Sequence, residues 1–549
     1  MNFILYSDIG ENSIDKSLGL PEYSYYFVLK AFRTVLAELG TVTLVRYPET
    51  EVDPLFEECL QRGEECVFLS FSPPNKTLID LKCPTISVFA WGYSNLPDEL
   101  WDDDVRNDWR AVFARHGRAI ALSSHTARIV KDAMGAAFPV LVVPVPLWER
   151  FANARARFGR SLPPTKSVLQ LRGTVIDSPL LGLSADGLIA HLSCPEVPAV
   201  AEQEPPPAAV EPLLESTPEA EPEPEPAAEP QPQPLAPSKN LRYRLAVTKH
   251  YLVAWYREAL RDLLPLWLAK AVAVGGRSGY ELGRAVAGSS RKKIQPLPAE
   301  PPALPIASAP LPEESPAPAP VQEPEAVVHL EGVIYTSVFN PMDGRKNWID
   351  MLTAFCMTFR EVEDATLVIK MDERDLQLYH NVLLTILSQL SPFKCRVVTL
   401  HACLDDAEYE ELIGATSYYV NTSLCEGACV PLMEFMSCGK PAIAPRHTAM
   451  EDYIDEGAAF IVKSSLEHDI WPQDPRELFR TLRYRLDWAS ICTAFEDSYH
   501  VAKQQPEKYI AMSGRAMARQ ESYCSGASAK EQLRSFLLQS EDERITAVI

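Results

Sequence analysis

The sequence predicts an α/β protein in which two doubly wound domains flank a long proline-rich insert. Short apolar runs alternate with helix-like stretches over residues 1–160, and the same alternation returns over residues 329–490. Most of the 47 prolines fall between these two regions. Alternating strands and helices are typical of a parallel sheet covered by helices on both faces, whereas proline interrupts both elements.

Six apolar runs indicate the strands of the N-terminal domain, which we place at residues 1–160. The chain begins MNFILYSDIG, a buried first strand, and the stretch SYYFVLKAFRTVLAELG that follows it has the apolar spacing of a helix. The remaining runs lie at 41–47, 66–71, 85–91, 119–124 and 139–146.

The insert is predicted at 161–328, and its two proline-rich tracts lie at 197–237 and 294–326. Such tracts favour extended polyproline-type linkers. Between them, residues 239–293 carry twelve basic and three acidic residues together with leucine and tryptophan. This composition predicts an amphipathic helix, either on an anionic membrane surface or docked on the enzyme or a partner protein.

A second set of strands indicates the C-terminal domain at 329–490, followed by C-terminal helices at 491–549. Polar sequence after residue 475 is expected to be helical. The strand-like runs lie at 333–339, 365–370, 396–400, 417–423, 441–445 and 459–464.

Charge and composition exclude several classes of protein. The chain has 52 Lys+Arg against 74 Asp+Glu, a net charge of −22, so nucleic acid is not an expected partner. The start lacks the features of a signal peptide, and no apolar run is long enough to span a bilayer. Twelve cysteines without a secretory signal indicate reduced thiols. We therefore expect a cytoplasmic location, with peripheral attachment to the inner face of the membrane as a further option.

The stretch from 421 to 441 is the most informative part of the sequence. A strand ends, a short loop contains Gly427, and a helix begins near Pro431, where a missing N–H costs nothing. The N-terminus of such a helix can bind a diphosphate. Glu426 precedes this helix and Glu434 lies inside it, so the two carboxylates can hold two distant hydroxyl-bearing parts of one extended ligand.

This stretch resembles the family 4 retaining glycosyltransferases of the GT-B architecture, which has two Rossmann-like domains and a deep cleft. The family's mark is a Glu, seven residues, Glu pattern followed by a small-residue, Gly, Pro ending, which Ser437-Cys438-Gly439-Lys440-Pro441 matches. The resemblance implies that Glu426 contacts the donor sugar and Glu434 the nucleotide ribose. It also implies that the segment from Gly427 through Val430, Pro431 and Leu432 faces the sugar and the diphosphate.

A second match covers 334–354, where Arg345 and Lys346 end a loop between a strand and a helix. Cations at this place can neutralise a diphosphate leaving group, and the resemblance assigns that role to Lys346. The family usually carries an arginine about six residues earlier. Asn340 occupies that place, and Arg345 is the candidate substitute. Lys370, at the end of a strand, is a weaker candidate for donor binding.

In the N-terminal half, the resemblance implies that loops facing the cleft bind the acceptor. Gly10 and Gly19 lie in the loop after the first strand, where glycine lets the backbone approach a ligand closely. Trp91 follows another strand and can either stack on a sugar or fill the core. Many relatives carry a polar or acidic residue in this segment, and Gly92 offers none.

No metal or other cofactor is expected, because the substrate is a nucleotide sugar and this fold class usually needs no metal. Asp102, Asp103 and Asp104 are interpreted as a solvated turn. We interpret the cysteines of the 421–441 stretch as small buried thiols, and His125 and His447 as core or capping residues.

The expected function is that of a glycosyltransferase that moves a sugar from a nucleotide-sugar donor to a glycan or lipid-linked acceptor with retention, in bacterial surface polysaccharide or lipopolysaccharide synthesis. The alternative is a catalytically weak, glycosyltransferase-like scaffold that acts through its insert, which Asn340 and Gly92 favour. A glycan phosphorylase is disfavoured, because no lysine context for pyridoxal phosphate is found.

Overall fold

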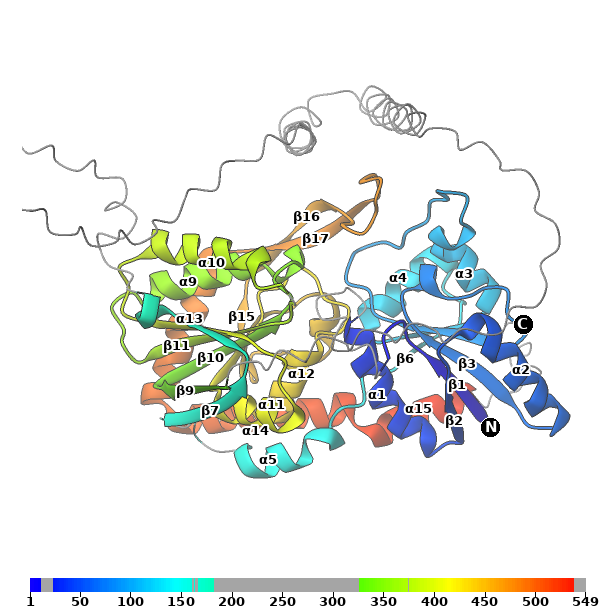
Figure 1. Cartoon of the computed structure of the whole chain (residues 1–549), viewed down its shortest axis with the longest axis horizontal. Helices are drawn as coiled ribbons and strands as arrows, with labels where there is room; N and C mark the ends of the chain where they lie inside the picture. The colour runs from blue at the N-terminus through cyan, green and yellow to red at the C-terminus, as the bar shows by residue number, and fades with distance from the viewer. Residues whose placement is uncertain (11–22, 160–161, 163–165, 182–324, 374, 538–549) are drawn as a thin grey trace, which may run out of the picture. The chain divides into compact units, whose positions relative to one another are not determined.

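The computed structural model describes residues 1–10, 23–159, 162, 166–181, 325–373 and 375–537 (Figure 1). All of them belong to one compact unit formed by residues 1–199 and 319–549. The predicted proline-rich tracts and the basic segment 239–293 lie outside the described residues. Within the described part of the chain, no helix combines the length and the apolarity needed to cross a bilayer.

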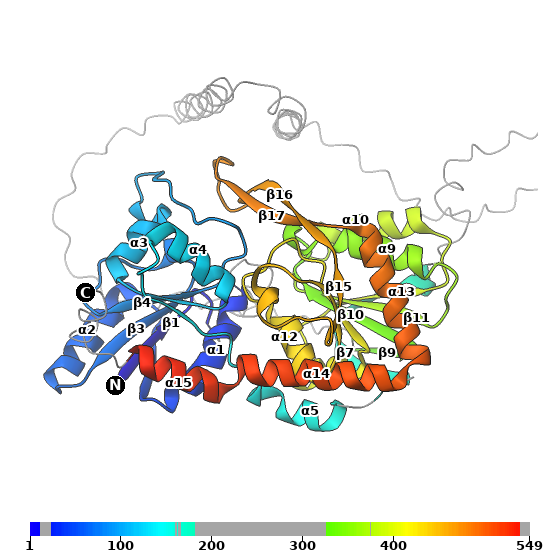
Figure 2. The same ribbon diagram turned by 180° about the vertical axis from the view of Figure 1, so that it is seen from behind.

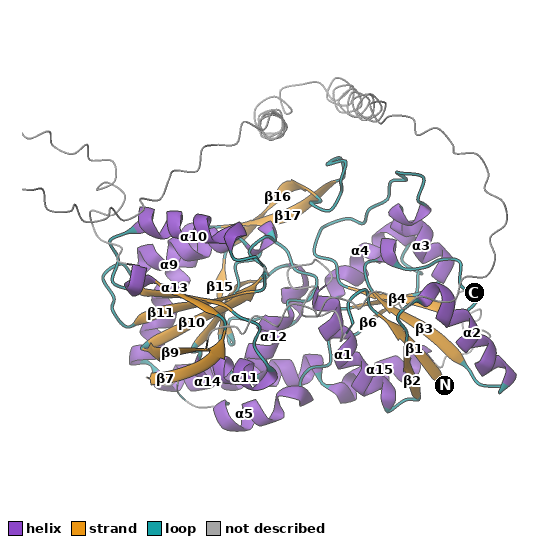
Figure 3. Cartoon of the chain, viewed as in Figure 1, coloured by secondary structure: helices purple, strands orange, loops and turns teal. Residues whose placement is uncertain are grey.

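The N-terminal sheet is parallel throughout and has the order β2-β1-β3-β4-β5-β6 (Figure 3). All side chains of β3 and β4 are buried, as expected for strands covered on both faces. The strands are β1 (Asn2–Tyr6), β2 (Thr41–Leu44), β3 (Cys66–Phe71), β4 (Thr85–Phe89), β5 (Ala119–Ala121) and β6 (Val140–Val142). The helices are α1 (Tyr23–Ala37), α2 (Pro48–Gln61), α3 (Trp109–His116) and α4 (Ser124–Met134).

The C-terminal sheet has seven strands in the order β15-β14-β13-β10-β11-β12-β8. Six of them are parallel and match the predicted runs. They are β10 (Val333–Phe339), β11 (Ala365–Met371), β12 (Arg396–His401), β13 (Tyr418–Val420), β14 (Ala442–Pro445) and β15 (Ala459–Val462). The helices are α9 (Trp348–Thr358), α10 (Gln377–Leu390), α11 (Asp406–Ala415) and α12 (Val430–Ser437). The predicted fold class, two doubly wound Rossmann-like α/β domains, is confirmed.

Strand order reverses its direction between β10 and β13 in the C-terminal sheet and between β1 and β3 in the N-terminal sheet. In open α/β sheets, ligands bind outside the carboxyl ends of the strands at such switch points. The loops that follow β10 and β13 therefore mark the expected ligand site of the C-terminal domain, and these loops contain the two predicted motifs.

The start of the predicted insert belongs to the C-terminal domain instead. Strand β8 (Thr174–Asp177) pairs antiparallel with β12 and completes its sheet, and β7 (Lys166–Arg172) pairs antiparallel with β9 (Glu325–Glu331). Val168 and Val327 remain exposed in this two-stranded ribbon. Buried and exposed residues alternate over only a few positions of β7, and half of the strand faces solvent. So short a pattern, next to proline-rich sequence, did not indicate a strand.

The expectation of helix after residue 475 is also wrong in its first part. Strands β16 (Ser464–Ile470) and β17 (Arg480–Leu486) form an antiparallel hairpin. Cross-strand ion pairs compensate its charges, since Arg483 contacts both Glu467 and Asp469. A two-stranded ribbon with alternating charged residues has the same polar composition as a surface helix. Composition alone therefore did not distinguish a hairpin from a helix.

Helices α13 (Trp488–Gln504), α14 (Pro506–Cys524) and α15 (Gly526–Leu537) follow the hairpin (Figure 2). Helix α13 packs on α9, α14 on α12, and α15 on α1, so the C-terminal helices contact both domains. Helix α5 (Ala152–Phe158) packs on α11. Short 3-10 segments are η2 (Pro74–Lys76), η3 (Val105–Asn107), η4 (Glu149–Phe151), η5 (Ser178–Leu181), η8 (Gly344–Lys346) and η9 (Thr448–Asp452).

The ion pair between Asp177 and Arg396 tests the assignment of β8 to the sheet. Arg396 donates from Nε to Asp177 Oδ1 at 3.0 Å and from Nη2 to Oδ2 at 2.6 Å. Replacing Asp177 by alanine is expected to lower the free energy of unfolding by about 1–3 kcal/mol, because a part-buried guanidinium loses two charge-assisted bonds. Urea denaturation measures this change. The exposed pair Lys166–Glu331 is the control, and Glu331→Ala should leave the midpoint unchanged.

Candidate active site

Helix α12 begins at the place that the sequence predicts, directly after the loop that follows β13. Its first turn contains Pro431, and the residue before the helix, Cys429, has φ 60°. The side-chain amide nitrogen of Asn421 donates to the sulfur of Cys429 at 3.0 Å, and the side-chain Oδ1 of Asn421 accepts from the Ser423 N–H at 2.9 Å. These contacts hold the loop in place, and the first N–H groups of the helix are left without partners within the helix.

Glu426 lies in this loop and is only 4% exposed. Its Oε1 accepts from Lys346 Nζ at 2.5 Å, and its own N–H donates to the Thr448 hydroxyl at 3.0 Å. Burial alone would raise the pKa of the Glu426 carboxyl, but Lys346 and Arg345 outweigh burial and hold the pKa below its usual value. The buried carboxylate therefore stays ionised.

The loop that follows β10 supplies both cations. Asp343 accepts from the Arg345 N–H at 3.2 Å and from Arg345 Nε at 3.0 Å, and Arg345 Nη1 donates to the Cys425 carbonyl at 3.2 Å. The backbone N–H of Leu424 donates in turn to the Arg345 carbonyl at 2.7 Å. Burial opposes the charge of Lys346, yet Glu426 raises the pKa of Lys346 above its ordinary value. The two predicted motifs thus form one hydrogen-bonded unit.

Glu434 lies inside α12 and is also buried, at 6% exposure. Its Oε2 accepts from the Tyr409 hydroxyl at 2.7 Å, and its Oε1 accepts from Arg150 Nη1 at 3.4 Å. Burial raises the pKa of Glu434 although Arg150 and Tyr409 act against it. The two carboxylates therefore differ electrostatically. Glu426 is tightly paired and its pKa is lowered, whereas Glu434 is paired more weakly and its pKa is raised.

Arg150 and Tyr409 were not among the sequence-predicted residues. Arg150 lies 284 positions before Glu434 in η4 and also donates to Asp406 Oδ1 at 2.8 Å. Nothing in the local sequence around Arg150 distinguishes it from the neighbouring arginines. Tyr409 lies on α11, outside the stretches 334–354 and 421–441 that carry the two motifs.

Two cavities meet at the N-terminus of α12, and both are lined by Val430 and Pro431. The larger, of about 350 Å³, is also lined by Trp91, Arg345, Lys346, Glu426 and Gly427. The smaller, of about 160 Å³, is also lined by Arg150, Lys370, Asp372, Tyr409 and Glu434. The structure therefore brings most of the predicted residues together, with each of the two glutamates in a different cavity.

Two of the predicted donor-binding residues, Asn340 and Leu432, line neither cavity, whereas Lys370 lines the smaller one. Neither cavity is lined by Asn340, whose side-chain oxygen accepts from the Met342 N–H at 2.8 Å. Leu432 has a fully buried side chain in the core. Lys370 forms an ion pair with Asp372 within the smaller cavity. Roles for Asn340 and Leu432 in donor binding stay predictions.

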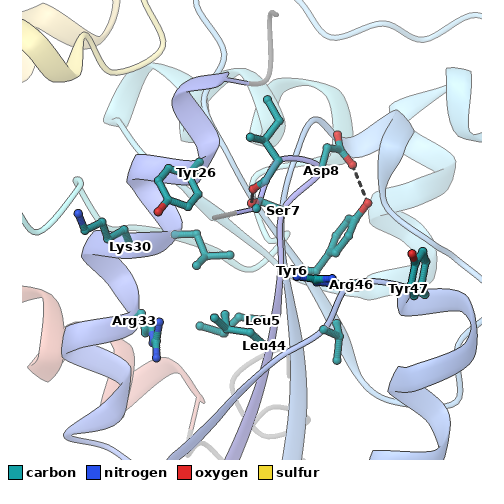
Figure 4. Close-up of a pocket in the computed structure, with 14 residues that line it drawn as sticks. Leu5, Tyr6, Ser7, Asp8, Tyr26, Lys30, Arg33, Leu44, Arg46 and Tyr47 are labelled. Carbon is teal, nitrogen blue, oxygen red and sulfur yellow. Dashed lines mark hydrogen bonds between the residues drawn. The ribbon is translucent and has the colours of Figure 1, made fainter. Parts of the chain in front are cut away.

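Gly10 lines a third cavity, of about 450 Å³, beyond the end of β1 (Figure 4). Its walls include Arg33 and Arg46, and the Tyr6 hydroxyl donates to Asp8 Oδ1 at 2.9 Å within it. Glu426 does not line this cavity. Gly19 lies outside the described residues, so the acceptor role of this loop stays a prediction.

Gly92 contacts the loop of Glu426 directly. A Cβ at Gly92 would lie 2.9 Å from the Glu426 nitrogen, and a Cβ at Gly427 would lie 2.6 Å from the Trp91 nitrogen. Both substituents would collide with backbone atoms of the opposite loop. The absence of a side chain at position 92, a departure from the resemblance, therefore lets the N-terminal loop contact the backbone of the candidate site.

The two histidines that the sequence analysis interprets as core or capping residues, His125 and His447, are both buried. Burial lowers the pKa of His125 and of His447 to about 4, so both rings are neutral at pH 7. The His447 ring stacks on Tyr484 at 4.2 Å. The cysteines of the 421–441 stretch, Cys425, Cys429 and Cys438, are buried free thiols. In the described part of the chain, no group of three or more His, Cys, Asp or Glu side chains is arranged to hold a metal ion.

Comparison with known proteins gives structural likeness only. No family model matches the chain, and no curated protein does. Sucrose-phosphate synthase (tll1590) from Thermosynechococcus elongatus is 17% identical, with a TM-score of 0.28 over 40% of this chain and 46% of that chain. This chain thus matches less than half of that enzyme.

Two further structures are similar. Anabaena Alr3699/HepE in complex with UDP and glucose is 10% identical, with a TM-score of 0.42 over 98% of this chain and 99% of that chain. The pneumococcal O-GlcNAc transferase GtfA in complex with UDP and GlcNAc is 15% identical, with a TM-score of 0.28 over 38% and 36%. Likeness at this level establishes neither a family nor an activity, and the fold class rests on the two parallel sheets themselves.

The buried pair Lys346–Glu426 predicts a pH-dependent stability. Because the Glu426 pKa is lowered by folding, the pair stabilises the folded chain fully above the ordinary value of 4.5 and loses this effect as the pH falls through the lowered pKa. Lys346→Met leaves a buried, uncompensated carboxylate and is expected to lower the free energy of unfolding by about 3–5 kcal/mol at pH 7.

Denaturant unfolding at several pH values measures this deficit. It should shrink as the pH falls toward 4.5, because Glu426 of the variant has lost Lys346 and takes up a proton at a higher pH than Glu426 of the wild-type chain does. The double variant Lys346→Met, Glu426→Gln removes both charges and should recover part of the loss at pH 7. A deficit that is equal at pH 7 and pH 4.5 would contradict the assignment of the carboxylate.

Proposed function

We propose that the chain is a retaining glycosyltransferase that transfers a sugar from a nucleotide-sugar donor to a glycan or lipid-linked acceptor. The observation that carries this proposal is the placement of Glu426 and Glu434 in two adjoining cavities that meet at the N-terminus of α12. An extended ligand with hydroxyls at both ends and a diphosphate between them fits this arrangement, and a nucleotide sugar has that form. The resemblance of the 421–441 stretch to family 4 supports the same reading.

In this proposal, the diphosphate binds against the free N–H groups that open α12, where the helix dipole favours negative charge. Glu434 accepts hydrogen bonds from the ribose hydroxyls in the smaller cavity, with Tyr409 and Arg150 holding its carboxylate. Glu426 accepts from hydroxyls of the donor sugar in the larger cavity, and Lys346 keeps it ionised.

The reaction breaks the bond between the anomeric carbon and the diphosphate oxygen, and the electron pair leaves with that oxygen. Lys346 and Arg345 lie in the same cavity and stabilise the developing negative charge. The acceptor hydroxyl attacks from the face that the diphosphate leaves, which retains the configuration, and its proton passes to the departing diphosphate. No step requires a metal ion.

A catalytically weak binding protein is the second candidate. Two observations favour it: Asn340 lines neither cavity, and Arg345, its candidate substitute, is already engaged by Asp343 and the Cys425 carbonyl. The acceptor class, the pathway, the cytoplasmic or peripheral membrane location and the binding of a membrane or partner through 239–293 stay predictions from the sequence.

Nucleotide binding tests the role of Glu434. A thermal-shift screen of the full chain against nucleoside diphosphates and nucleotide sugars is expected to identify at least one stabilising nucleotide. Glu434→Ala should weaken binding of that nucleoside diphosphate about 10- to 100-fold, because the ribose loses charge-assisted hydrogen bonds, while inorganic pyrophosphate binds as before. Exposed Glu456 is the control, and Glu456→Ala should change neither affinity. Equal loss for both ligands would contradict the ribose assignment.

A measurement of turnover distinguishes the proposed glycosyltransferase from the catalytically weak binding protein. Glu426→Gln keeps the size of the side chain and one acceptor oxygen, but it removes the charge and replaces the other oxygen with an amide donor. We expect release of the nucleoside diphosphate from the donor to fall about 100-fold or more, with the affinity for the nucleoside diphosphate within about threefold of wild type. Coupled detection of the released nucleotide measures the rate. Equally slow release by wild type and variant, with binding intact, would favour the second candidate.

A further inference from the structure

Three free cysteines lie together in the N-terminal domain, away from the candidate active site. They are Cys59 near the end of α2, Cys66 at the start of β3 and Cys83 two residues before β4. Helix α2 packs on β1 and β3 (Figure 1), and the three cysteines belong to the small apolar cluster between this helix and the sheet. The cluster therefore lies at the amino ends of the strands, opposite the carboxyl ends where ligands of such sheets bind.

The sheet places Cys66 and Cys83 next to each other. Strands β3 and β4 are parallel, Phe68 is paired with Thr85, and the Phe68 N–H donates to the Pro84 carbonyl at 2.9 Å. Two residues earlier on each chain, Cys66 and Cys83 are the next neighbours on the same face, where adjacent strands lie about 4.8 Å apart. A disulfide spans Cα atoms that are about 4.4–6.8 Å apart. The two thiols are also hydrogen-bonded to each other.

The surroundings of Cys66 favour its thiolate form. A hydrogen bond from Cys83 lowers the pKa of Cys66, and a hydrogen bond from Cys59 and the charge of Arg62 act in the same direction against burial. Arg62 contacts the cluster directly, since its Nη2 donates to the Cys59 sulfur at 3.4 Å. Burial raises the pKa of Cys59, and the hydrogen bond to Cys66 raises that of Cys83. The thiolate is the reactive form of cysteine, so Cys66 is the nucleophile of the cluster.

A second pair of neighbouring thiols lacks these features and serves as a reference. Cys356 on α9 is hydrogen-bonded to Cys395, which precedes β12. This hydrogen bond and burial raise the pKa of Cys356, and no cation in the described part of the chain acts against them. The exposed fractions of Cys356 and Cys395 are 1% and 2%, against 7% for Cys66. Proximity of two thiols is thus common to both pairs, whereas charge and exposure distinguish Cys66.

We propose that hydrogen peroxide oxidises Cys66, which then forms a reversible disulfide with Cys83. The Cys66 thiolate attacks one peroxide oxygen, the O–O bond breaks, and the departing hydroxide takes up a proton and becomes water. Cys66 is left as a sulfenic acid. The Cys83 sulfur then attacks the Cys66 sulfur, the S–O bond breaks, and the hydroxide leaves with the proton of Cys83 as a second water. Two thiols are oxidised, and one peroxide is reduced to two waters.

The structure gives the two cysteines different parts in this sequence. The hydrogen bond to Cys66, burial and the negative charge of Cys66 all raise the pKa of Cys83. The last effect ends when Cys66 becomes an uncharged sulfenic acid, so Cys83 loses its proton more easily at that stage. Arg62, which covers the cluster at Cys59, has a side chain that is 51% exposed, so a molecule as small as peroxide has only this side chain to pass.

Peroxide treatment of the full chain tests this site. The reduced protein, freed of reductant, is treated with a small excess of hydrogen peroxide, and the remaining thiols are alkylated at successive times. Mass spectrometry of the digest identifies the joined cysteines. We expect a bond between Cys66 and Cys83 that forms at least about tenfold faster than one between Cys356 and Cys395, and that dithiothreitol reverses.

Serine variants separate the two steps. Cys83→Ser should leave Cys66 as a sulfenic acid, which a cyclic 1,3-diketone traps. Cys66→Ser should give neither the disulfide nor a sulfenic acid at Cys83. Cys356→Ser is the matched control, because it removes one thiol of the other hydrogen-bonded pair, and it should leave the Cys66–Cys83 bond and its rate unchanged.

Several results would overturn the inference. They are the absence of any intramolecular disulfide in the wild-type chain, a bond from Cys66 to Cys59 in place of Cys83, and equal rates for the two thiol pairs. Trapping of a sulfenic acid at Cys83 in Cys66→Ser would have the same effect. The wild-type results need no variant, and none of them depends on the proposed function, because the cysteines line neither cavity of the candidate site and the assay contains no nucleotide or sugar.

Discussion

The buried ion pair between Lys346 and Glu426 is the interaction on which the candidate site depends. It joins the loops that leave the carboxyl ends of β10 and β13, the strands on either side of the switch point. The pair is retained in a buried place because each charge lowers the cost of burying the other. The surrounding backbone is satisfied as well, since the Glu426 N–H donates to the Thr448 hydroxyl and the Leu424 N–H donates to the Arg345 carbonyl. A charge-compensated, pre-formed loop is the surface against which the N-terminal domain packs.

The contact between the two domains follows from this arrangement. The backbone of Gly92 lies against the backbone of Glu426, and that of Gly427 against Trp91, with no side chain between them. Further along the interface, the Ser124 N–H donates to Asp452 Oδ2 at 2.8 Å. A larger residue at either glycine would separate the loops and change the cavity that Arg345, Lys346 and Glu426 line. The two loops can approach this closely only because both positions, Gly92 and Gly427, are glycine.

Local sequence patterns were sufficient for the strands and helices that are buried on both faces. Runs such as 333–339 and 365–370 are mostly apolar, and every residue in them is buried, so their strand conformation was predicted correctly. The pattern failed for β7 and for the hairpin β16–β17, because these elements are half-solvated and their charged or polar residues resemble linkers or surface helices. The predicted boundary of the insert and the predicted helix after residue 475 were wrong for that reason.

The sequence by itself determined the helix that begins at Val430, the spacing of its two carboxylates and the pair of cations after β10, because these features depend on residues close together in the chain. Only the tertiary structure decided which groups surround them. Arg150 reaches Glu434 across 284 positions, and Trp471 contacts Trp91 across 380 positions. Such contacts depend on how the sheets, the hairpin and the C-terminal helices pack, and packing is set by the whole chain and not by any local pattern.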